Sequence, residues 1–204
     1  MEDHIKAWDR DYLRRGKLWG GAAKNLPDLP SGSKILEIGC GSGKTIASMP
    51  SNWNVAAIDV SKRAVEMARG FALGKIQMAV ADARKLPFKD RSFDVVFAFH
   101  VTGHVLGEDR RRMAIESSRV LKDSGRLFFR EFEVQDMRSG KGIEVEEMTF
   151  QRGEGEITHY FTEDEVIDLF SALEPLSIQA HKWKMRVRGR DLIRFELEAE
   201  FVRR

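Results

Sequence analysis

The chain has 204 residues, of which 42% are hydrophobic and 32% are charged, a balance typical of one ordinary globular domain. Its formal net charge is +2, so whole-chain basicity does not argue for a nucleic-acid partner. Cys40 is the single cysteine, which excludes an internal disulfide. The first residues are polar and no apolar run reaches the length of a membrane span, so we expect a cytoplasmic protein whose residues 1–204 form one domain.

The segment over residues 4–26 is predicted to be helical, although three glycines interrupt its apolar pattern. We expect residues 1–32 to form an N-terminal helical cap on the domain. Tyr12 and Trp19 are candidate substrate-binding aromatics, because an aromatic segment ahead of the first strand can cover a bound ligand. The alternative is that these rings only pack against the domain.

Residues 35–45 read Ile-Leu-Glu-Ile-Gly-Cys-Gly-Ser-Gly-Lys-Thr and carry the strongest pattern. The apolar run predicts a buried strand over 34–39, and three glycines within five residues permit a turn with positive φ. A helix is expected over 43–49, ended by Pro50. A strand, a glycine turn and a helix N-terminus form a nucleotide-sized site beyond the carboxyl end of the strand.

Spacing separates three chemistries for this glycine loop. A P-loop ending in Gly-Lys-Thr needs its first glycine at position 38, which is Ile38. A dinucleotide fingerprint needs a third glycine at position 44, which is Lys44. The remaining pattern is an acid inside the strand, Glu37, followed by three alternating glycines.

Acids also follow the next two predicted strands. The second strand, over 54–58, ends in Asp59, 20 residues after Gly39, where a carboxylate can accept hydrogen bonds from both ribose hydroxyls. This position is shared with NAD enzymes, so it supports a ribose without choosing the cofactor. Ser61 is the predicted N-cap of the following helix. The third strand, over 76–81, is followed by Asp82.

A fourth strand is predicted over 93–99 and a fifth over 126–132, with an amphipathic helix over 108–121 between them. Strands therefore alternate with helices through residue 133. This alternation is typical of parallel βα units.

Together, Glu37 with its glycines, Asp59, and Asp82-Ala83 followed by Leu86-Pro87-Phe88 resemble motifs I to III of the class I S-adenosylmethionine (SAM) methyltransferases, over residues 33–130. The resemblance implies an α/β fold: a seven-stranded, mostly parallel sheet with helices on both faces and an antiparallel C-terminal hairpin. It implies SAM as cofactor and S-adenosylhomocysteine as product. It also implies the cofactor-binding residues Glu37, Gly39, Cys40, Gly41, Gly43, Asp59, Val60, Asp82, Ala83 and Phe99.

In this family the end of the fourth strand faces the transferable methyl group. His100 and His104 follow that strand here, so they are the candidate catalytic residues, since imidazole titrates near neutral pH. The alternative is a pair of structural histidines. We expect no metal, and with Cys40 in the cofactor loop no free cysteine is left for attack on a pyrimidine ring.

Residues 133–160 are expected to form an insertion that shapes the substrate site, with Tyr160 as a further substrate-binding candidate. Thr162 and Glu165 predict a capping box at the next helix. The chain from 175 onward predicts a hairpin with a three-residue loop over 189–191. That register places Lys184 opposite Glu196 and Lys182 opposite Glu198, so the basic stripe is interpreted as a solvated charge ladder rather than an RNA track.

The predicted function is methyl transfer from SAM to an acceptor that stays open between a small molecule, RNA and a protein. Arg130-Glu131-Phe132 and Tyr160-Phe161-Thr162 faintly resemble the tRNA cytidine-N3 methyltransferase branch. Two alternatives remain: an NAD-dependent oxidoreductase, and a SAM-binding partner subunit without chemistry. No membrane partner is expected, and the oligomeric state is left open.

Overall fold

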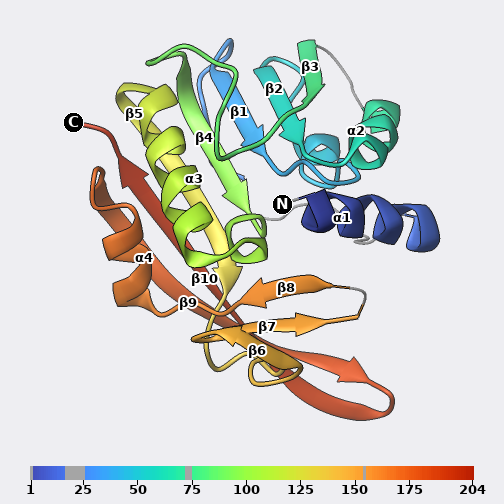
Figure 1. Ribbon diagram of the computed structural model, residues 1–204. Coiled ribbons are helices and arrows are strands. Elements are labelled where there is room, and N and C mark those ends of the chain that lie inside the picture. Colours follow the sequence, from blue (N-terminus) through green and yellow to red (C-terminus); the bar gives the residue numbers. More distant parts are fainter. Residues whose placement is uncertain (1, 17–25, 72–74, 154) are drawn as a thin grey trace.

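The computed structural model describes residues 2–16, 26–71, 75–153 and 155–204. Its main feature is a seven-stranded sheet in the order β3-β2-β1-β4-β5-β10-β9 (Figure 1). The sheet strands are β1 (Lys34–Ile38), β2 (Asn54–Asp59), β3 (Lys75–Val80), β4 (Phe93–Phe99), β5 (Leu121–Phe132), β9 (Glu174–Val187) and β10 (Arg190–Val202). The first five pair in parallel and β10 is antiparallel to both of its neighbours, which confirms the predicted fold class.

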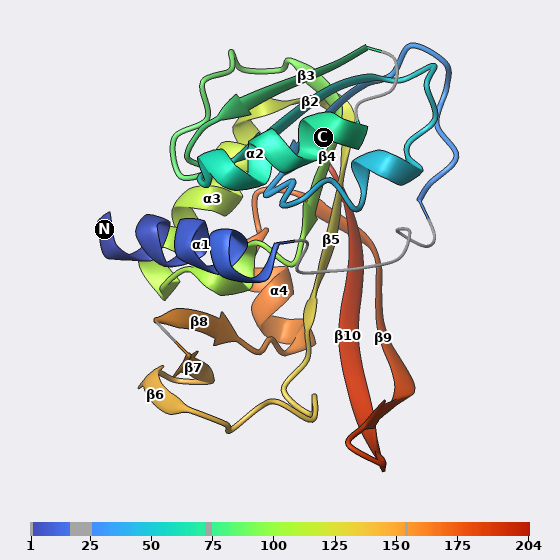
Figure 2. The ribbon, with the colours of Figure 1, turned by 90° about the vertical axis from the view of Figure 1, so that its right-hand side faces the viewer.

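Helices cover both faces of this sheet (Figure 2). They are α1 (Glu2–Arg15), α2 (Lys62–Ala68), α3 (Gly107–Val120) and α4 (Glu163–Leu169), with the short 3₁₀ helices η1 (Ile46–Ser48), η2 (Arg69–Phe71) and η3 (Thr102–His104). Helices α3 and α4 pack on one face around side chains such as Phe129 and Phe170. On the other face α2 and η1 cover β2 through Val65 and Ile46. Among the residues placed by the structure, no helix has both the length and the apolar character needed to cross a membrane.

The helix expected over 43–49 is wrong; the structure has only the single turn η1 there. Gly43 has a φ of 87°, which lies in the left-handed region and excludes it from a right-handed helix. Because Pro50 closes the segment on the other side, no room remains for a full α-helix. The predicted N-cap of α2 is confirmed, since Ser61 Oγ accepts a hydrogen bond from the Ala64 N–H at 3.1 Å.

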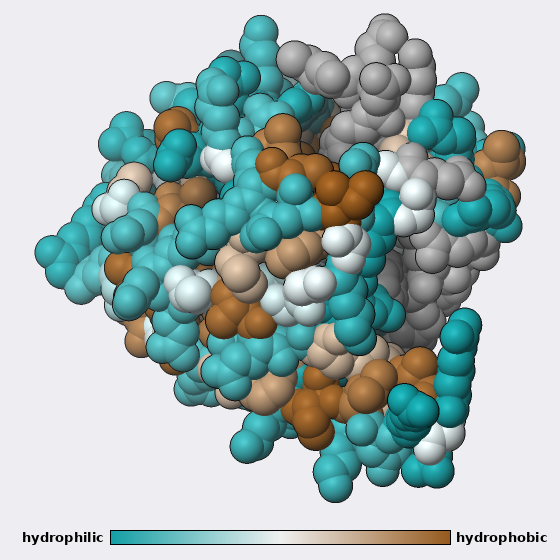
Figure 3. All heavy atoms as spheres, turned by 60° about the horizontal axis from the view of Figure 1, so that its bottom comes forward, coloured by the Kyte–Doolittle hydropathy of each residue, from teal (hydrophilic) through white to brown (hydrophobic). Residues whose placement is uncertain are grey.

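Residues 133–160 form a second sheet of three antiparallel strands, β6 (Ile143–Glu146), β7 (Thr149–Arg152) and β8 (Glu156–His159). Strand β8 packs against η3 and α1, so the insertion borders the loop that follows β4. Figure 3 views the molecule from this end, where the visible surface is mostly hydrophilic with apolar side chains in small groups.

The register predicted for the final hairpin is wrong. The β9–β10 turn has two residues, Arg188 and Gly189, both with positive φ (48° and 79°), as in the turns whose twist matches paired strands. Consequently Lys184 pairs with Ile193 and Lys182 with Phe195. The predicted charge ladder does not form, and Glu196 and Glu198 become available to other partners.

Candidate active site

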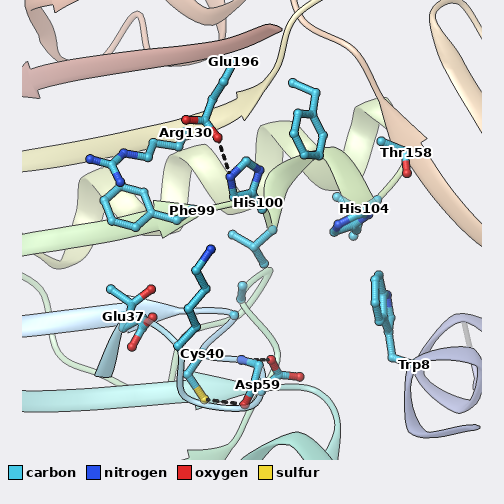
Figure 4. A pocket seen from close by; sticks show the side chains of 18 of the residues that line it. Trp8, Glu37, Cys40, Asp59, Phe99, His100, His104, Arg130, Thr158 and Glu196 are labelled. Atoms are coloured by element: carbon cyan, nitrogen blue, oxygen red, sulfur yellow. Dashed lines mark hydrogen bonds and ion pairs between the residues drawn. The ribbon is translucent and has the colours of Figure 1, made fainter. Parts of the chain in front are cut away.

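A cavity of about 970 Å³ lies at the carboxyl ends of the parallel strands. Strands β1 and β4 are neighbours although they are not consecutive in the chain, and ligands of open α/β sheets bind at such a switch point. Figure 4 shows Glu37, Cys40 and Asp59 on one side of this cavity and His100 with Glu196 on the other.

The glycine loop brings these two sides together. Gly39 has a φ of 72°, and a Cβ on it would lie 2.4 Å from Cγ2 of Val101. A Cβ on Gly41 would lie 2.8 Å from the Tyr12 hydroxyl of α1. The absence of side chains therefore lets the loop after β4 and helix α1 both approach the backbone that follows β1.

Glu37 is 3% exposed, and its Oε2 is buried without a hydrogen-bond partner within the described part of the chain. Burial raises the pKa of this carboxyl to about 8, against the effect of a hydrogen bond with Thr45. A buried carboxyl with an unbonded oxygen on a cavity wall suits a cationic ligand. The ammonium group of SAM fits this requirement.

Asp59 lies beside the glycine loop and accepts hydrogen bonds from the N–H groups of Gly41 and Ser61, each at 2.9 Å. Burial raises its pKa to about 6. Each carboxylate oxygen has a second lone pair, so Asp59 can still accept from ribose hydroxyls. Its surroundings also hold α1 in place, because Asp9 contacts the Ser61 hydroxyl.

Asp82 lines the cavity but is already engaged by Arg84. The Arg84 Nε and Nη2 donate to Asp82 at 2.9 and 2.6 Å, and Nη1 donates to Asp109 at 2.6 Å. To bind adenine, Asp82 would have to accept a hydrogen bond from the adenine amino group while it also accepts from Arg84. The adenine contact of Asp82 remains a prediction. Other expected cofactor residues that line the cavity are Cys40, Val60, Ala83 and Phe99.

Gly43 does not line the cavity; a Cβ on it would lie 3.0 Å from Cα of Ala68 in α2. Its role in the structure is close packing of the loop on α2 rather than a wall of the site. Trp19 lies outside the described residues.

His100 occupies the point where β4 ends, with a φ of 51° that is uncommon for a residue with a side chain. Its Nε2 lies 2.8 Å from Glu196 Oε2, and its ring packs on Phe132 at 4.7 Å between centroids. Its Nδ1 is buried without a hydrogen-bond partner in the part of the chain that is placed. Such strained backbone is common in active sites, and the ring is held firmly at the cavity wall.

Glu131 is a neighbour of His100 that the sequence analysis named only within the Arg130-Glu131-Phe132 motif, without a role in the site. It is 1% exposed, accepts the Gly103 N–H at 2.8 Å and lies 4.0 Å from His100 Nδ1. Burial raises its pKa to about 7, while the charge of His100 acts in the opposite direction. Only the tertiary structure could reveal it, since it projects from β5 toward the loop after β4.

His104 lies at the edge of the cavity, between α1 and the insertion. Its Nδ1–H donates to the Ile157 carbonyl at 2.8 Å, and the Trp8 ring meets it edge-on at 4.7 Å. Both rings line the cavity. Trp8 of α1 therefore lines the cavity, and the expected cover of the site by residues 1–32 stays a prediction.

The two candidate tyrosines have different places. Tyr12 is buried over Gly41 and lines the cavity. Burial raises its pKa, so its hydroxyl stays neutral. Tyr160 is fully buried and does not line the cavity; its hydroxyl accepts a hydrogen bond from Arg152 Nη2 at 2.8 Å. Tyr160 thus orients Arg152, which does line it.

Beyond His100 the cavity ends in a wall that combines aromatic and cationic side chains. Phe132 ends β5, and Trp183 and Arg194 face each other across β9 and β10. The Arg194 guanidinium lies over the Phe132 ring at 4.1 Å and near the Trp183 ring at 5.9 Å. Within the portion of the chain that the structure covers, no group of three or more His, Cys, Asp or Glu is arranged to hold a metal.

Comparison with known proteins finds similarity to methyltransferases. A methyltransferase-domain model matches residues 36–129. The Gallus gallus tRNA N(3)-cytidine methyltransferase METTL2 is 25% identical over 72% of this chain and 44% of its own length. The corresponding Schizosaccharomyces pombe enzyme, trm140, is 29% identical over 80% of this chain and 62% of its own. The O-methyltransferase cnsE of Penicillium expansum is 36% identical over 47% and 37%.

This chain thus spans between 37% and 62% of the length of these relatives. Among solved structures, a SAM-dependent methyltransferase from Methanosarcina mazei aligns with a TM-score of 0.71 and 27% identity, over 86% of this chain and 95% of that one. A Haloferax volcanii methyltransferase solved with the activator Trm112 shares the fold, with a TM-score of 0.71 and 18% identity over 99% and 98% of the chains. Residues 36–129 thus match a methyltransferase-domain model, and the chain has the fold of class I SAM-dependent methyltransferases.

Proposed function

We propose that the protein transfers a methyl group from SAM to a ring nitrogen of cytosine in RNA. The observation that carries this proposal is the unbroken cavity from the buried Glu37 to the aromatic wall of Phe132 and Trp183. One end suits a cationic cofactor, and the other suits a flat ring that stacks on aromatic side chains.

The relatives favour cytosine over other flat acceptors. The two tRNA cytidine relatives match 72% and 80% of this chain, whereas the O-methyltransferase matches 47%. A match of that length must extend beyond residues 36–129 into segments that bound the acceptor end of the cavity. We therefore propose that residues 1–204 act as one methyltransferase domain, in which residues 1–32 cover the site and 133–160 shape the acceptor pocket.

SAM supplies an activated methyl group, and the protein's task is to hold donor and acceptor in line. In this proposal Glu37 binds the ammonium group, Asp59 the ribose hydroxyls and Asp82 the adenine, with the alternating glycines giving the backbone close access. These roles agree with the burial and hydrogen bonds of the three acids. An NAD cofactor has less support, because Lys44 stands where its third glycine is required.

The groups around His100 suit an attacking ring nitrogen. Such a nitrogen uses its lone pair and loses no proton before attack, so positive charge develops on the base. Glu196 is bonded to His100, which outweighs burial and lowers the pKa of this carboxyl. Its negative charge beside this point stabilises the positive charge that develops on the base. His100 then positions the base, and His104 helps to close the cavity over it.

A second candidate acceptor is the hydroxyl group of a small molecule, favoured by the O-methyltransferase relative. A hydroxyl must lose its proton, and His100 would then act as the general base through its unbonded Nδ1. The two candidates differ in their dependence on this histidine. His100→Asn should abolish hydroxyl methylation but leave ring-nitrogen methylation within about tenfold of wild type.

The test is a radiolabelled-methyl assay on unmodified tRNA, followed by nucleoside mass spectrometry for 3-methylcytidine. Asp59→Ala should lose both SAM binding by calorimetry and methylation, because ribose recognition is removed. The matched control, Asp123→Ala, removes a mostly exposed acid remote from the cavity and should retain both. Near-unchanged SAM affinity in the Asp59 variant would contradict the cofactor assignment; SAM binding without a labelled cytosine would reject RNA as acceptor.

A further inference from the structure

Three arginines from different elements line the cavity beyond His100. Arg138 follows β5, Arg152 ends β7 and Arg194 belongs to β10. We propose that these side chains form an oxyanion subsite that binds a phosphate group of the acceptor. The inference that these arginines bind a phosphate group rests on the positions of their side chains. The inference that this phosphate belongs to an RNA acceptor rests on the proposed function.

Arg194 provides the strongest observation. It is 2% exposed, and its Nη2 is buried without a hydrogen-bond partner in the described structure. Its Nε donates to Asp136 Oδ2 at 2.5 Å. Arg194 lines the cavity, and a buried guanidinium nitrogen without an acceptor is costly, so an acceptor atom of a ligand bound there would satisfy it.

The guanidinium of Arg194 is also held rigidly. Asp136, its partner, accepts the backbone N–H groups of Arg138 at 3.0 Å and Phe195 at 3.1 Å. The Phe132 ring packs against the guanidinium plane at 4.1 Å. A donor fixed in this way loses little conformational entropy when it binds an oxyanion.

Arg138 and Arg152 add charge at the same place. Burial lowers the pKa of Arg138, and the positive charges of Arg194 and Arg152 lower it further. The three cations are therefore close enough to repel one another. The Tyr160 hydroxyl that accepts from Arg152 is neutral, so it orients this guanidinium without cancelling its charge.

Phosphate is the oxyanion that this arrangement suits best. Guanidinium groups bind oxyanions through paired N–H donors, and three of them approaching from separate elements match a group with several oxygens. The Phe132 ring connects the subsite to the proposed reaction site, because this ring contacts both His100 and Arg194. A nucleotide whose base reaches His100 would place its own or a neighbouring phosphate there.

The experiment uses inorganic phosphate as the probe, with thermal unfolding followed at matched ionic strength in phosphate, acetate and chloride. We expect a saturable rise in Tm with phosphate and a smaller one with acetate. The double variant Arg138→Gln/Arg152→Gln keeps the Arg194–Asp136 pair, so it should fold and bind phosphate at least tenfold more weakly. The control, Arg188→Gln/Arg190→Gln, removes the same charge at the exposed hairpin turn and should match wild type.

Equal phosphate affinity in the double variant, or an equal response to chloride in wild type, would overturn the subsite. A stronger response to acetate would reassign it to a carboxylate. The tRNA methylation assay on the same variants distinguishes failure of the proposed function from failure of the subsite. If tRNA is not methylated while phosphate binding depends on these arginines, the RNA acceptor is wrong and the subsite stands. If tRNA is methylated and its KM is unchanged in the double variant, the function stands and the subsite fails.

Discussion

Among single residues, Glu37 has the largest consequence for ligand binding. Its pKa of about 8 means that it is mostly protonated at neutral pH in the ligand-free protein. A cation placed against its unbonded oxygen favours the ionised form. Binding of SAM should therefore expel a proton from this carboxyl.

Glu37→Gln should weaken SAM binding about tenfold at pH 7, the loss of one charge-assisted contact of about 1.5 kcal/mol. It should also remove the proton released on binding. Calorimetry in two buffers with different ionisation enthalpies measures that proton directly. Glu108→Gln, which changes an exposed acid on α3, is the control. An unchanged proton count in the Glu37 variant would contradict this role.

The residues that the sequence identified and those it missed differ in how they reach the site. Glu37 and Asp59 stand at strand ends, where position in the chain alone predicts position in the sheet. Glu131 comes to lie beside His100, and Arg194 comes to line the cavity, only through pairing between distant strands. In β10 the alternating pattern marks Arg194 as polar, and nothing local indicates that Asp136 and Phe132 bury it.

At the scale of elements, the cofactor loop depends on how α1 and α2 are held together. Ser61 caps α2 and its hydroxyl also contacts Asp9 of α1. Helix α1 in turn places Tyr12 over Gly41. The Ser61 cap is thus a joint between α2, which follows Asp59 in the chain, and α1, whose Tyr12 lies over the loop.

Ser61→Ala should lower the free energy of unfolding by about 1 kcal/mol, the typical contribution of an N-cap, and should weaken SAM binding because α1 loses its contact. Thr162→Ala is the matched variant, since Thr162 caps α4 by accepting the Glu165 N–H at 3.2 Å and lies away from the cavity. Thr162→Ala should lower the free energy of unfolding, measured in urea, by a similar amount and should leave SAM affinity unchanged. Equal SAM affinity in both variants would show that the joint does not matter.

The order and type of the main elements follow from periodicity, but their registers do not. The observed turn, 188–189, is shorter than the predicted turn, 189–191, and lies earlier in the chain, so every cross-strand partner shifts by three residues. That difference changes every cross-strand pair, and it turned an expected charge ladder into pairs such as Lys184 with Ile193. The expected helix over 43–49 failed because the pattern gives no weight to the backbone angle of Gly43.

On the scale of the whole molecule, three buried acids make stability depend on pH. Burial raises the pKa values of Glu37, Glu131 and Asp59 to about 8, 7 and 6, whereas they ionise near pH 4 in an unfolded chain. Between these values the folded protein holds more protons than the unfolded chain, so stability falls as pH rises. Acids with lowered pKa values, such as Asp94 and Glu116, titrate below this window.

The ligand-free protein should therefore lose stability as the pH rises from about 5 toward 8, because in this range the folded acids keep protons that the unfolded chain releases. Urea unfolding at intervals of half a pH unit measures the slope. Glu131→Gln removes one of the three acids and should flatten the profile below about pH 7. A profile that rises over this range would contradict the assignment.

The continuity of the cavity has a practical consequence. Among the described residues, Glu37 and the rings of Phe132 and Trp183 line one cavity, so one covalent molecule can be designed to span both ends. An adenosine joined by a short linker to cytosine would gain the effective concentration of an intramolecular second contact. If the proposed function is correct, such a bisubstrate compound should inhibit methyl transfer, and a phosphate added toward Arg194 should strengthen its binding.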